Sequence, residues 1–586
     1  MTSMEDERSA LEDGILLLQN EGSKLYTGDG SVDIHGKPVL KQNTGNWKAC
    51  FFILGAECCE RMAFFGISAN LVTYITKILH EGNVSAAKTV SVWQGTCYVT
   101  PLIGATVADG YWGRYWTIAA FSTIYFIGMC ALSLSAAIPA LIPAECVGSA
   151  CPPGTVTQST AFLFGIYLVA LGTGGIKPCV SPFGADQFDD SDPKERVMKG
   201  SFFDWFYFSF SIGILIAGTF LVWIQDNVGW GLGFCIPTLC MGIAIIVFLL
   251  GTPLYRLQKP RGFPFTRMCQ VLVSSCRKWN LELPKDSSLL YETPDISSAV
   301  EGSCILEHTD TLKFLDKAAV VSDAEISDGD VFNPWRLCTV NQVEELKTLI
   351  RMFPIWATGI VFAAVYAQMS TTFLEQGMMM NTTIGFLTIP PASLSTCYVI
   401  CVLFLVPIYD RIIVAIARKF THRGKGFSSF QRMGIGLFIS VLSPSAAAVL
   451  EVYRLRLAKD LDLTGEKVAV PLSILWQIPQ YFLVGAAEVL GYIGQLEFFY
   501  EESPKSLRSL CSALYLLGFS LGFYMNSFTL TVVTYFTTKG GKVGWIPENL
   551  NEGHLDYLFW LWAGLSFLNM LVYVVFAIKF KSKKSF

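Results

Sequence analysis

Apolar stretches of membrane-spanning length recur along the whole chain, and no other feature limits its fold so strongly. A helix needs about 20 residues to cross about 30 Å of hydrocarbon. Only 15% of the residues are charged, which leaves little for the polar linkers of a multidomain soluble protein. Twelve spans are predicted, at residues 48–76, 87–109, 115–140, 158–182, 201–226, 230–251, 343–373, 386–416, 430–453, 469–500, 506–537 and 556–580. The sequence therefore predicts an all-α, multi-pass membrane protein that lies in the lipid bilayer.

A long polar stretch divides the twelve spans into two groups of six. Residues 252–342 are acidic and rich in serine, and their simplest interpretation is a cytosolic linker. Two six-helix halves are the arrangement of secondary transporters of the major facilitator superfamily, which bind substrate between the halves. The predicted domains are an N-terminal cytosolic tail (1–46), a six-helix bundle (47–251), the linker (252–342), a second six-helix bundle (343–580) and a C-terminal cytosolic tail (581–586).

Lysine and arginine predict which side of the membrane each connection faces, since cytosolic loops are enriched in both. Most of them fall on the side of the two termini, although several run against the trend. We therefore place both termini in the cytosol. The two Asn-x-Ser/Thr triplets begin at Asn83 and Asn381, and both fall on the predicted outer side.

Three charged residues lie inside the first predicted span. Glu57, Glu60 and Arg61 occupy positions i, i+3 and i+4, so that a helix projects all three from one face. A single charge at mid-membrane costs about 2.5 to more than 10 kcal/mol, so these groups are expected to face a cavity or one another. One arginine beside two carboxylates leaves one carboxylate without a local partner, and such a group holds a proton more tightly. We favour a proton relay here over an ion pair that only locks two helices together.

Further charges inside the spans indicate a central cavity. Lys177 follows a glycine-rich run in the fourth span, and Glu488 lies in the tenth. Asp109 and Arg114, in the short turn between the second and third spans, are predicted to pair at a cytosolic gate. All five histidines lie outside the membrane cores, so the proton carrier is expected to be a carboxylate.

Cysteine usage gives no indication of a metal site. Most of the 17 cysteines lie within spans, where a buried cysteine acts as a small apolar residue. Cys146 and Cys151 lie in an outer loop, where a disulfide persists if one forms. A disulfide and two unpaired thiols remain alternatives for this pair.

Several motifs resemble those of the proton-dependent oligopeptide transporter family, a branch of the major facilitator superfamily. The sequence "ECCER" (57–61) matches the family's E-x-x-E-R motif, and "FGADQFDDSDPKER" resembles its second signature region. The segments "YAQMSTTFLEQG" and "GQLEFFYEESP" are similar to the plant nitrate/peptide transporter branch, and most similar to its di- and tripeptide transporters. The resemblance extends over residues 47–580.

The resemblance implies roles for the matched positions. Glu57, Glu60 and Arg61 are expected to couple protons to substrate binding. Arg61 and Lys177 are expected to face the carboxylate of a peptide, while Glu488 pairs with Lys177 or receives the peptide's amino group. A zwitterion needs a cationic and an anionic end in one cavity. The other residues expected to bind substrate are Phe64, Phe65, Ser211, Tyr366 and Gln368.

The chain also departs from the family's pattern, and the departures make the expected cavity more apolar. They are Phe64 and Phe65 for two tyrosines, Ser211 for an asparagine, Cys397–Tyr398 for an acidic or amide residue, Phe523 for a polar residue and Ala367 for a glutamate. Tyr366 stands where the nitrate-transporting relatives carry a histidine, which argues against nitrate as the main substrate. An apolar cavity suits a tolerant peptide site, but it equally suits another organic substrate.

The leading hypothesis is a proton-coupled symporter of di- and tripeptides that works by alternating access. The alternative within this class is a carrier of another small organic anion, a hormone or nitrate. A membrane enzyme is disfavoured because the sequence has no metal-ligand spacing, nucleophile elbow or Walker loop. A sensor that binds substrate without transporting it is the third hypothesis.

The expected partners are protons, di- and tripeptides and lipid, with no cofactor, metal or nucleic acid. Glu12 precedes Leu16–Leu17 in an acidic dileucine pattern of the kind that sorting adaptors read. Because the resemblance is to plant proteins, this pattern favours the vacuolar membrane over the plasma membrane. Oligomeric state is not predicted.

Overall fold

The computed structural model confirms the helical, membrane-spanning character of the chain. It describes residues 26–28, 30–144, 152, 154–189, 191–258, 264–284, 286, 289–292, 308–321, 333–385, 387–421, 427–502 and 508–580. Within them, ten helical stretches are long and apolar enough to cross a membrane, and one of these, Asn83–Ala137, contains two predicted spans. The first predicted span falls on α2 (Asn46–Ser68), which is not among the ten because Glu57, Glu60 and Arg61 interrupt its apolar run.

The chain forms two compact units. Unit 1 consists of Met1–Arg261 and Ser370–Val399, and unit 2 of Gly262–Met369 and Ile400–Phe586. The segment Ser370–Val399 lies in the second half of the sequence, yet it belongs to unit 1. The prediction from the sequence had placed this segment with the C-terminal bundle.

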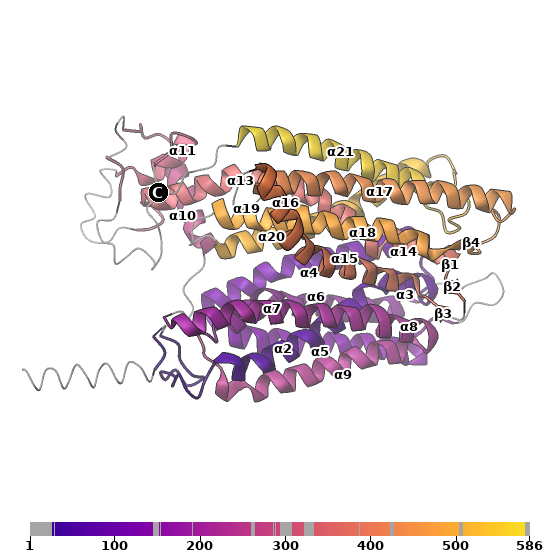
Figure 1. Ribbon diagram of the computed structural model, residues 1–586, viewed down its shortest axis with the longest axis horizontal. Helices are drawn as coiled ribbons and strands as arrows, with labels where there is room; N and C mark the ends of the chain where they lie inside the picture. Colours follow the sequence, from indigo (N-terminus) through magenta and orange to yellow (C-terminus); the bar gives the residue numbers. More distant parts are fainter. Residues whose placement is uncertain are drawn as a thin grey trace, which may run out of the picture. The chain divides into compact units, whose positions relative to one another are not determined.

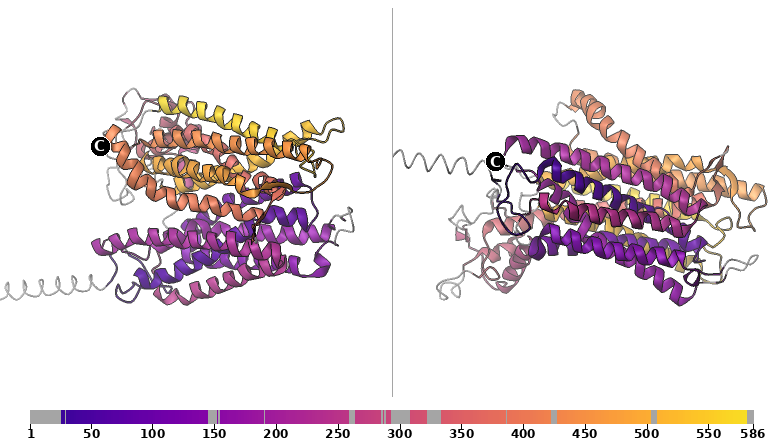
Figure 2. Two further views of the ribbon diagram at one scale, coloured as in Figure 1. Left: turned by 45° about the vertical axis from the view of Figure 1, so that its right-hand side comes forward. Right: turned by 90° about the horizontal axis from the view of Figure 1, so that it is seen from below.

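The helices of unit 1 lie side by side as a bundle (Figures 1 and 2). In chain order they are α2 (Asn46–Ser68), α3 (Leu71–Lys77), α4 (Asn83–Val107), η1 (Ala108–Trp112), α5 (Gly113–Ala137), η2 (Pro139–Leu141), α6 (Val156–Ala185), α7 (Pro193–Ile216), η3 (Ala217–Leu221), α8 (Val222–Asn227), α9 (Trp230–Leu250) and η4 (Thr252–Leu254). Helix α2 packs against α7 and α9, and α6 packs against α4 and α5. This packing surrounds the charged residues of α2 with other helices.

The segment Ser370–Val399 adds short elements to unit 1. They are the end of η7 (Ala367–Ser370), α14 (Thr372–Met378), β1 (Met380–Asn381), β2 (Thr383–Ile384), β3 (Leu387–Thr388), η8 (Pro391–Leu394) and the start of α15 (Ser395–Ile408). Strands β2 and β3 form an antiparallel pair, in which Thr383 is opposite Thr388. Helix α14 packs against α3.

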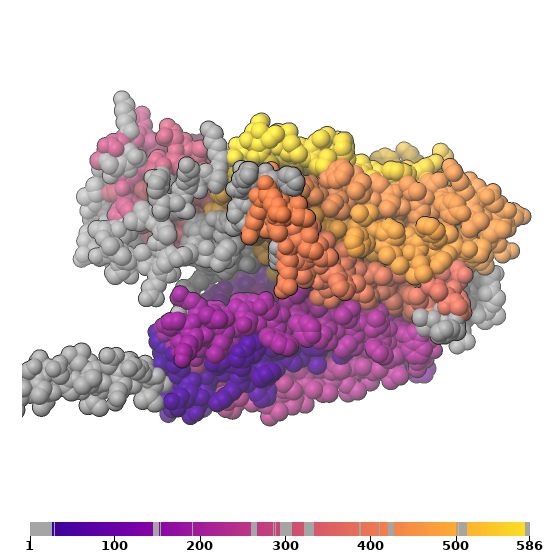
Figure 3. Space-filling model, in the orientation of Figure 1, coloured from indigo at the N-terminus to yellow at the C-terminus, as the bar shows by residue number. Residues whose placement is uncertain are grey.

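Unit 2 contains the remaining elements. They are α10 (Pro264–Arg277), α11 (Lys313–Asp316), η6 (Lys317–Ala319), α13 (Val340–Tyr366), η9 (Tyr409–Ile413), α16 (Val414–Thr421), α17 (Ser429–Asp460), β4 (Val470–Ser473), η10 (Ile474–Gln477), α18 (Ile478–Ala487), η11 (Glu488–Tyr492), α19 (Ile493–Glu502), α20 (Arg508–Thr537) and α21 (Leu555–Lys579). Helix α21 packs against α17 and α13. It forms an outer face of this unit, drawn in yellow in Figure 3, and only 22% of its most apolar stretch is buried.

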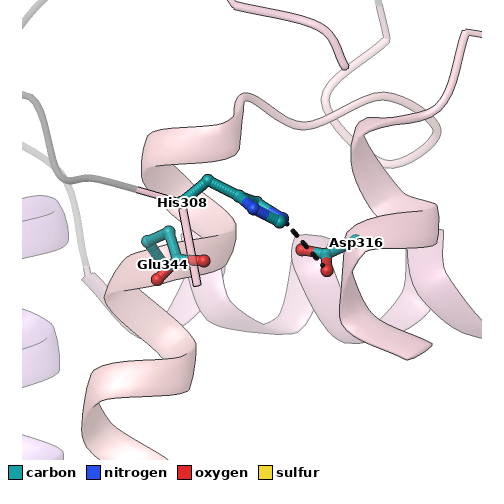
Figure 4. Close-up of side chains that lie close together, drawn as sticks. All are labelled: His308, Asp316 and Glu344. Carbon is teal, nitrogen blue, oxygen red and sulfur yellow. Dashed lines mark ion pairs between the residues drawn. The ribbon is translucent and has the colours of Figure 1, made fainter. Parts of the chain in front are cut away.

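The predicted linker is tied to unit 2 by a buried cluster of charges. The side chains of His308, Asp316 and Glu344 each offer one atom that could bind a metal ion, and these atoms lie within 4.8 Å of one another (Figure 4). The Lys347 amine lies 2.7 Å from Asp316 Oδ1 and 2.9 Å from Glu344 Oε1, so this amine supplies the positive charge between the two carboxylates. His308 Nε2 lies 3.3 Å from Asp316 Oδ2. The cluster therefore joins the end of the linker to α13.

A second buried network joins three distant parts of unit 1 around Arg256. Its guanidinium donates hydrogen bonds to Glu195 and to the backbone oxygens of Gln187 and Thr44. Gly45, with φ of 68°, lies against it, and a Cβ at this position would come within 2.3 Å of Arg256 Nε. The signature segment around residues 187–195 thus has a structural role, because it fastens the N-terminal segment to the end of α9.

Two features noted in the sequence lie outside the described residues. They are the cysteine pair Cys146 and Cys151 and the dileucine pattern at Glu12, Leu16 and Leu17.

Candidate functional site

The candidate site is built on α2, whose helical spacing brings its three charges together. Arg61 Nε lies 2.9 Å from Glu57 Oε1, and Arg61 also forms an ion pair with Glu60. All three side chains are buried, with residue exposures between 2% and 6%. The expectation that one carboxylate has no local partner is wrong, because the guanidinium is wide enough to contact both.

The surroundings of this triad are mostly apolar. Arg61 lies over the ring of Phe210 in α7, with 5.3 Å from Cζ to the ring centroid. Glu57 and Glu60 line a cavity of about 20 Å³, large enough for one water molecule. The cavity lining is otherwise apolar except for Ser122 of α5. The low polarity strengthens the attraction between Arg61 and its two carboxylates.

Lys177 of α6 supplies a second positive charge in the same bundle. Its amine lies 3.9 Å from the ring centroid of Phe64 and 4.0 Å from that of Tyr98. It also donates a hydrogen bond of 3.5 Å to the backbone oxygen of Cys97. Two aromatic faces therefore hold the ammonium by cation–π attraction, which stabilises it by about 0.5–2 kcal/mol per ring.

The glycine-rich run before Lys177 allows α6 to approach α4 closely, as the sequence predicts. A Cβ on Gly104 would lie 2.0 Å from the backbone oxygen of Gly174, and a Cβ on Gly174 would lie 2.8 Å from that of Thr100. Neither distance is sterically possible. The contact fixes the height at which Lys177 meets Tyr98 on α4.

Phe64 and Phe65, which replace the tyrosines of the family pattern, have different surroundings. Phe64 stacks on Trp93 at 5.8 Å and presents a face to Lys177. Phe65 meets Phe210 edge-on at 6.1 Å. The hydroxyl of Ser211 donates a hydrogen bond to the backbone oxygen of Tyr207 at 2.9 Å, so it is used within α7.

The site residues predicted in unit 2 also have definite partners. Tyr366 packs edge-on against Phe519 at 5.4 Å. Gln368 is fully buried and donates hydrogen bonds to Asn526 Oδ1 at 2.8 Å and to the backbone oxygen of Ala364 at 2.9 Å. Substrate binding by the Gln368 amide would require these bonds to open.

Glu488 begins a π-helical turn, η11, in the tenth span. It is half-buried. Asp109 lies in another such turn, η1. Turns of this kind often occur at functional sites because they redirect side chains within a helix.

The predicted gate pair differs from the expectation. Arg114 Nε lies 4.0 Å from Asp109 Oδ1, whereas another of its nitrogens makes a short hydrogen bond to Asp186 beyond the end of α6. Arg114 therefore joins α5 to α6 more closely than it joins the two sides of its own turn. Asp186 could not be predicted as a partner from the sequence, because it lies 72 positions away from Arg114.

A comparison with protein families identifies the chain. A family model described as the POT family matches residues 115–546, which is well over half of the sequence. The chain belongs to the POT family. POT proteins are proton-coupled transporters, so the prediction of a transporter rather than an enzyme is confirmed.

Curated plant relatives of this POT protein cover nearly the whole chain, including the triad on α2. Arabidopsis thaliana NRT1/PTR family protein 8.3 is 62% identical over 586 residues, with 100% of both chains covered. Family protein 8.1 from the same plant is 55% identical and covers 96% of this chain and 99% of its own.

Solved structures share the fold. An auto-inhibited POT family peptide transporter superposes with a TM-score of 0.68 at 22% identity, and covers 92% of this chain and 98% of its own. A POT family transporter in complex with 5-aminolevulinic acid has a TM-score of 0.62 at 13% identity, with 92% and 99% covered. The predicted fold of two six-helix halves of the major facilitator type is thereby confirmed.

Reasoning from the sequence missed several neighbours of the site in this POT protein. Tyr98 and Phe210 hold the two positive charges, and Ser122 lines the cavity at the carboxylates. An aromatic residue close to an intramembrane cation was a usable signal in principle. The sequence contains 43 phenylalanines and 22 tyrosines, however, so only the packing selects these rings.

Proposed function

We propose that this chain is a proton-coupled symporter of di- and tripeptides that works by alternating access. The observation that carries the proposal is the contact of Arg61 with both Glu57 and Glu60 in the interior of unit 1. Burying three ionisable groups in so apolar a site costs free energy, and groups of this kind are typical of functional sites. All three lie on one helix, so their pairing is not needed to hold separate helices together.

Protonation of one carboxylate would release Arg61. A protonated Glu57 or Glu60 loses its negative charge, and its attraction to the guanidinium becomes weaker. The guanidinium then has positive charge available for the carboxylate of a substrate. Loss of the proton restores the pair and displaces the substrate, so proton binding and substrate binding favour each other.

A peptide substrate is supported by the second positive charge. Lys177 lies between two aromatic rings and donates only a long hydrogen bond to a backbone oxygen. Its charge therefore remains available to the carboxylate end of a peptide. For the amino end we propose Glu488, which the sequence indicates. Several solved structures of this fold are described as peptide transporters.

The proposal is tested by the change Glu60→Gln in the full-length protein. Uptake of a labelled dipeptide is measured in voltage-clamped oocytes at two external pH values, with surface expression measured in parallel. We expect proton-driven uptake to be lost and the protein to reach the membrane in normal amount, because glutamine keeps the shape of the side chain but cannot exchange a proton. Glu466→Gln, which changes an exposed carboxylate, is the matched control. Undiminished proton-driven uptake in Glu60→Gln would remove this residue from the mechanism.

A carrier of another small organic anion, a hormone or nitrate remains the second candidate. The rings of Phe64 and Phe65 replace hydroxyl-bearing residues of the family pattern, so the surroundings of Lys177 favour an anion with apolar parts. Competition among dipeptides, free amino acids, nitrate and organic anions in one uptake assay separates the candidates. Competition by nitrate but not by dipeptides would favour the second candidate.

We further propose that both termini lie in the cytosol and that the protein resides in the vacuolar membrane. The basic loops and the dileucine pattern of the N-terminal tail support this location. Replacing Leu16 and Leu17 by alanine in a fluorescent fusion is expected to move the protein to the plasma membrane. An unchanged location would exclude the pattern as the sorting signal.

A further inference from the structure

Glu375 on α14 is buried without a partner. Its residue exposure is 1%, and neither of its carboxyl oxygens has a hydrogen-bond partner among the described residues. An ionised carboxylate in such surroundings costs many kcal/mol unless it is paired, so the group becomes neutral by binding a proton instead. Glu375 is not part of the triad on α2, in which Glu57 and Glu60 both pair with Arg61.

The position of Glu375 depends on the packing of the segment Ser370–Val399 within unit 1. Ser370 donates a hydrogen bond of 3.0 Å to Gln94 of α4. Leu374, next to Glu375, and Ala392 of η8 both belong to the hydrophobic core of the unit. Glu375 is therefore buried because the segment Ser370–Val399 packs into unit 1.

Among the described residues, the elements that pack most closely against α14 provide no counter-charge for Glu375. Helix α14 packs against α3, β1 and η8, and of these only α3 carries titratable side chains, Tyr74 and Lys77. Lys77 is exposed, while the ring of Tyr74 packs among aromatic residues that include Trp230. Neither donates a hydrogen bond to the Glu375 carboxyl.

We propose that Glu375 is a second proton-binding site of this transporter, occupied when the segment Ser370–Val399 packs into unit 1. The proposal rests on the proposed function in one respect: alternating access requires this segment to separate from unit 1 during the cycle. Glu375 binds one proton from the surrounding solution as the segment packs, and it returns that proton as the segment separates. No other bond forms or breaks.

The site would make packing of the segment sensitive to pH on the outer side. Asn381, six positions further along, lies on the predicted outer side, so the proton would come from there. One proton changes the ratio of packed to separated segment by up to about tenfold per pH unit. Acid on the outer side therefore favours the packed segment, and this effect is separate from the binding of a proton at Glu57 or Glu60.

A spectroscopic experiment tests protonation without measuring transport. Infrared spectra of the purified full-length protein at neutral pH are compared for the wild type, Glu375→Gln, Glu375→Met and the control Glu466→Gln. We expect both Glu375 variants to lose intensity in the C=O stretch of a protonated carboxyl group, and the control to keep it. Methionine is the second variant because a buried apolar side chain packs there without the amide hydrogens of glutamine. If neither Glu375 variant loses this intensity, the carboxyl is ionised and the proposal is wrong.

A transport experiment tests the effect of the proton. Exchange of labelled for unlabelled dipeptide is measured in proteoliposomes with the same pH on both sides, from pH 6 to pH 8.5. We expect the rate of wild-type exchange to fall as the pH rises. The decrease in rate between pH 6 and pH 8.5 should be at least about threefold smaller for Glu375→Gln, because its neutral side chain packs without binding a proton. Equal pH profiles would overturn the proposal. Absence of dipeptide transport by the wild type would instead contradict the proposed function, and the infrared result would remain decisive for Glu375.

Discussion

Two buried arginines in unit 1, Arg61 and Arg256, have similar burial but different sets of partners. Arg256 is 0% exposed and its donors reach Glu195 and backbone oxygens of Lys41, Thr44 and Gln187. Arg61 is 6% exposed, and its contacts are ion pairs with two carboxylates of its own helix.

The difference separates a structural arginine from one suited to function. Apart from Glu195, the partners of Arg256 named here are backbone oxygens, which cannot accept a proton at ordinary pH, and they join segments that are far apart in the sequence. The partners of Arg61 are carboxylates, which a proton neutralises. Burial alone therefore does not distinguish the two arginines; the proposed function of Arg61 depends on both of its charged partners being carboxylates that a proton can neutralise.

The largest effect is expected for stability, on replacing Arg256. The change Arg256→Gln leaves Glu195 buried and without its partner, which costs about 3–5 kcal/mol. In Arg61→Gln the loss of stability should be smaller, because the ion pairs of Arg61 lie within one helix, whereas the bonds of Arg256 hold distant segments together. The thermal unfolding midpoints of both variants in detergent measure this. Equal decreases in the two unfolding midpoints would show that the two arginines contribute equally to stability.

The next effect concerns Asp189, which belongs to the Arg256 region. Burial raises the pKa of Asp189, but hydrogen bonds from Ser191 and Gly28 outweigh this and lower the pKa to about 2, from an ordinary 3.8. The ionised carboxylate thus stabilises its hydrogen bonds with Ser191 and Gly28 above pH 4, and this contribution, about 2 kcal/mol in total, is lost as the pH falls towards 2.

We therefore expect Asp189→Asn to speed amide hydrogen exchange at Gly28 at neutral pH. Transport should keep its dependence on external pH, because Glu57 and Glu60 are unchanged. A variant that loses this dependence would show that the two regions are coupled.

A smaller effect is expected for Lys177. Under the proposed function, replacing it by glutamine removes one charge-assisted bond to the substrate carboxylate, which corresponds to about a tenfold or larger increase in KM for a dipeptide. A dipeptide with an amidated C-terminus serves as the control, since its KM should change little. Equal increases for both substrates would place Lys177 away from the substrate carboxylate.

The smallest effect distinguishes the two partners of Arg114. Asp186→Asn should lower stability by about 1 kcal/mol, and Asp109→Asn by less, because Arg114 makes a hydrogen bond only to Asp186 and these groups are partly exposed. The two unfolding midpoints, measured in parallel, test this order. A larger decrease in stability for Asp109→Asn would indicate that Arg114 pairs mainly with Asp109, as the sequence predicts.

Much of the fold could be predicted because the membrane simplifies the physics. Only helices and closed barrels satisfy all backbone hydrogen bonds in hydrocarbon, so apolar length located most of the spans. The predicted span that contains Glu57, Glu60 and Arg61 is also helical, although its charges interrupt the apolar run. Helical spacing likewise predicted that these three side chains share a face. The glycine-rich run before Lys177 indicated close helix packing, although only the structure identifies α4 as the helix that meets α6 there.

What the sequence determined by itself was therefore everything that depends on neighbours within one helix or on the contrast between oil and water. Only the tertiary structure decided which distant partner a charge selects: Asp186 for Arg114, and Glu195 with several backbone oxygens for Arg256. It also decided that Ser370–Val399 packs into unit 1, where Glu375 is buried without a hydrogen-bond partner among the described residues. Such pairings join segments tens to hundreds of residues apart, and nothing in the local sequence specifies which of many similar side chains will meet.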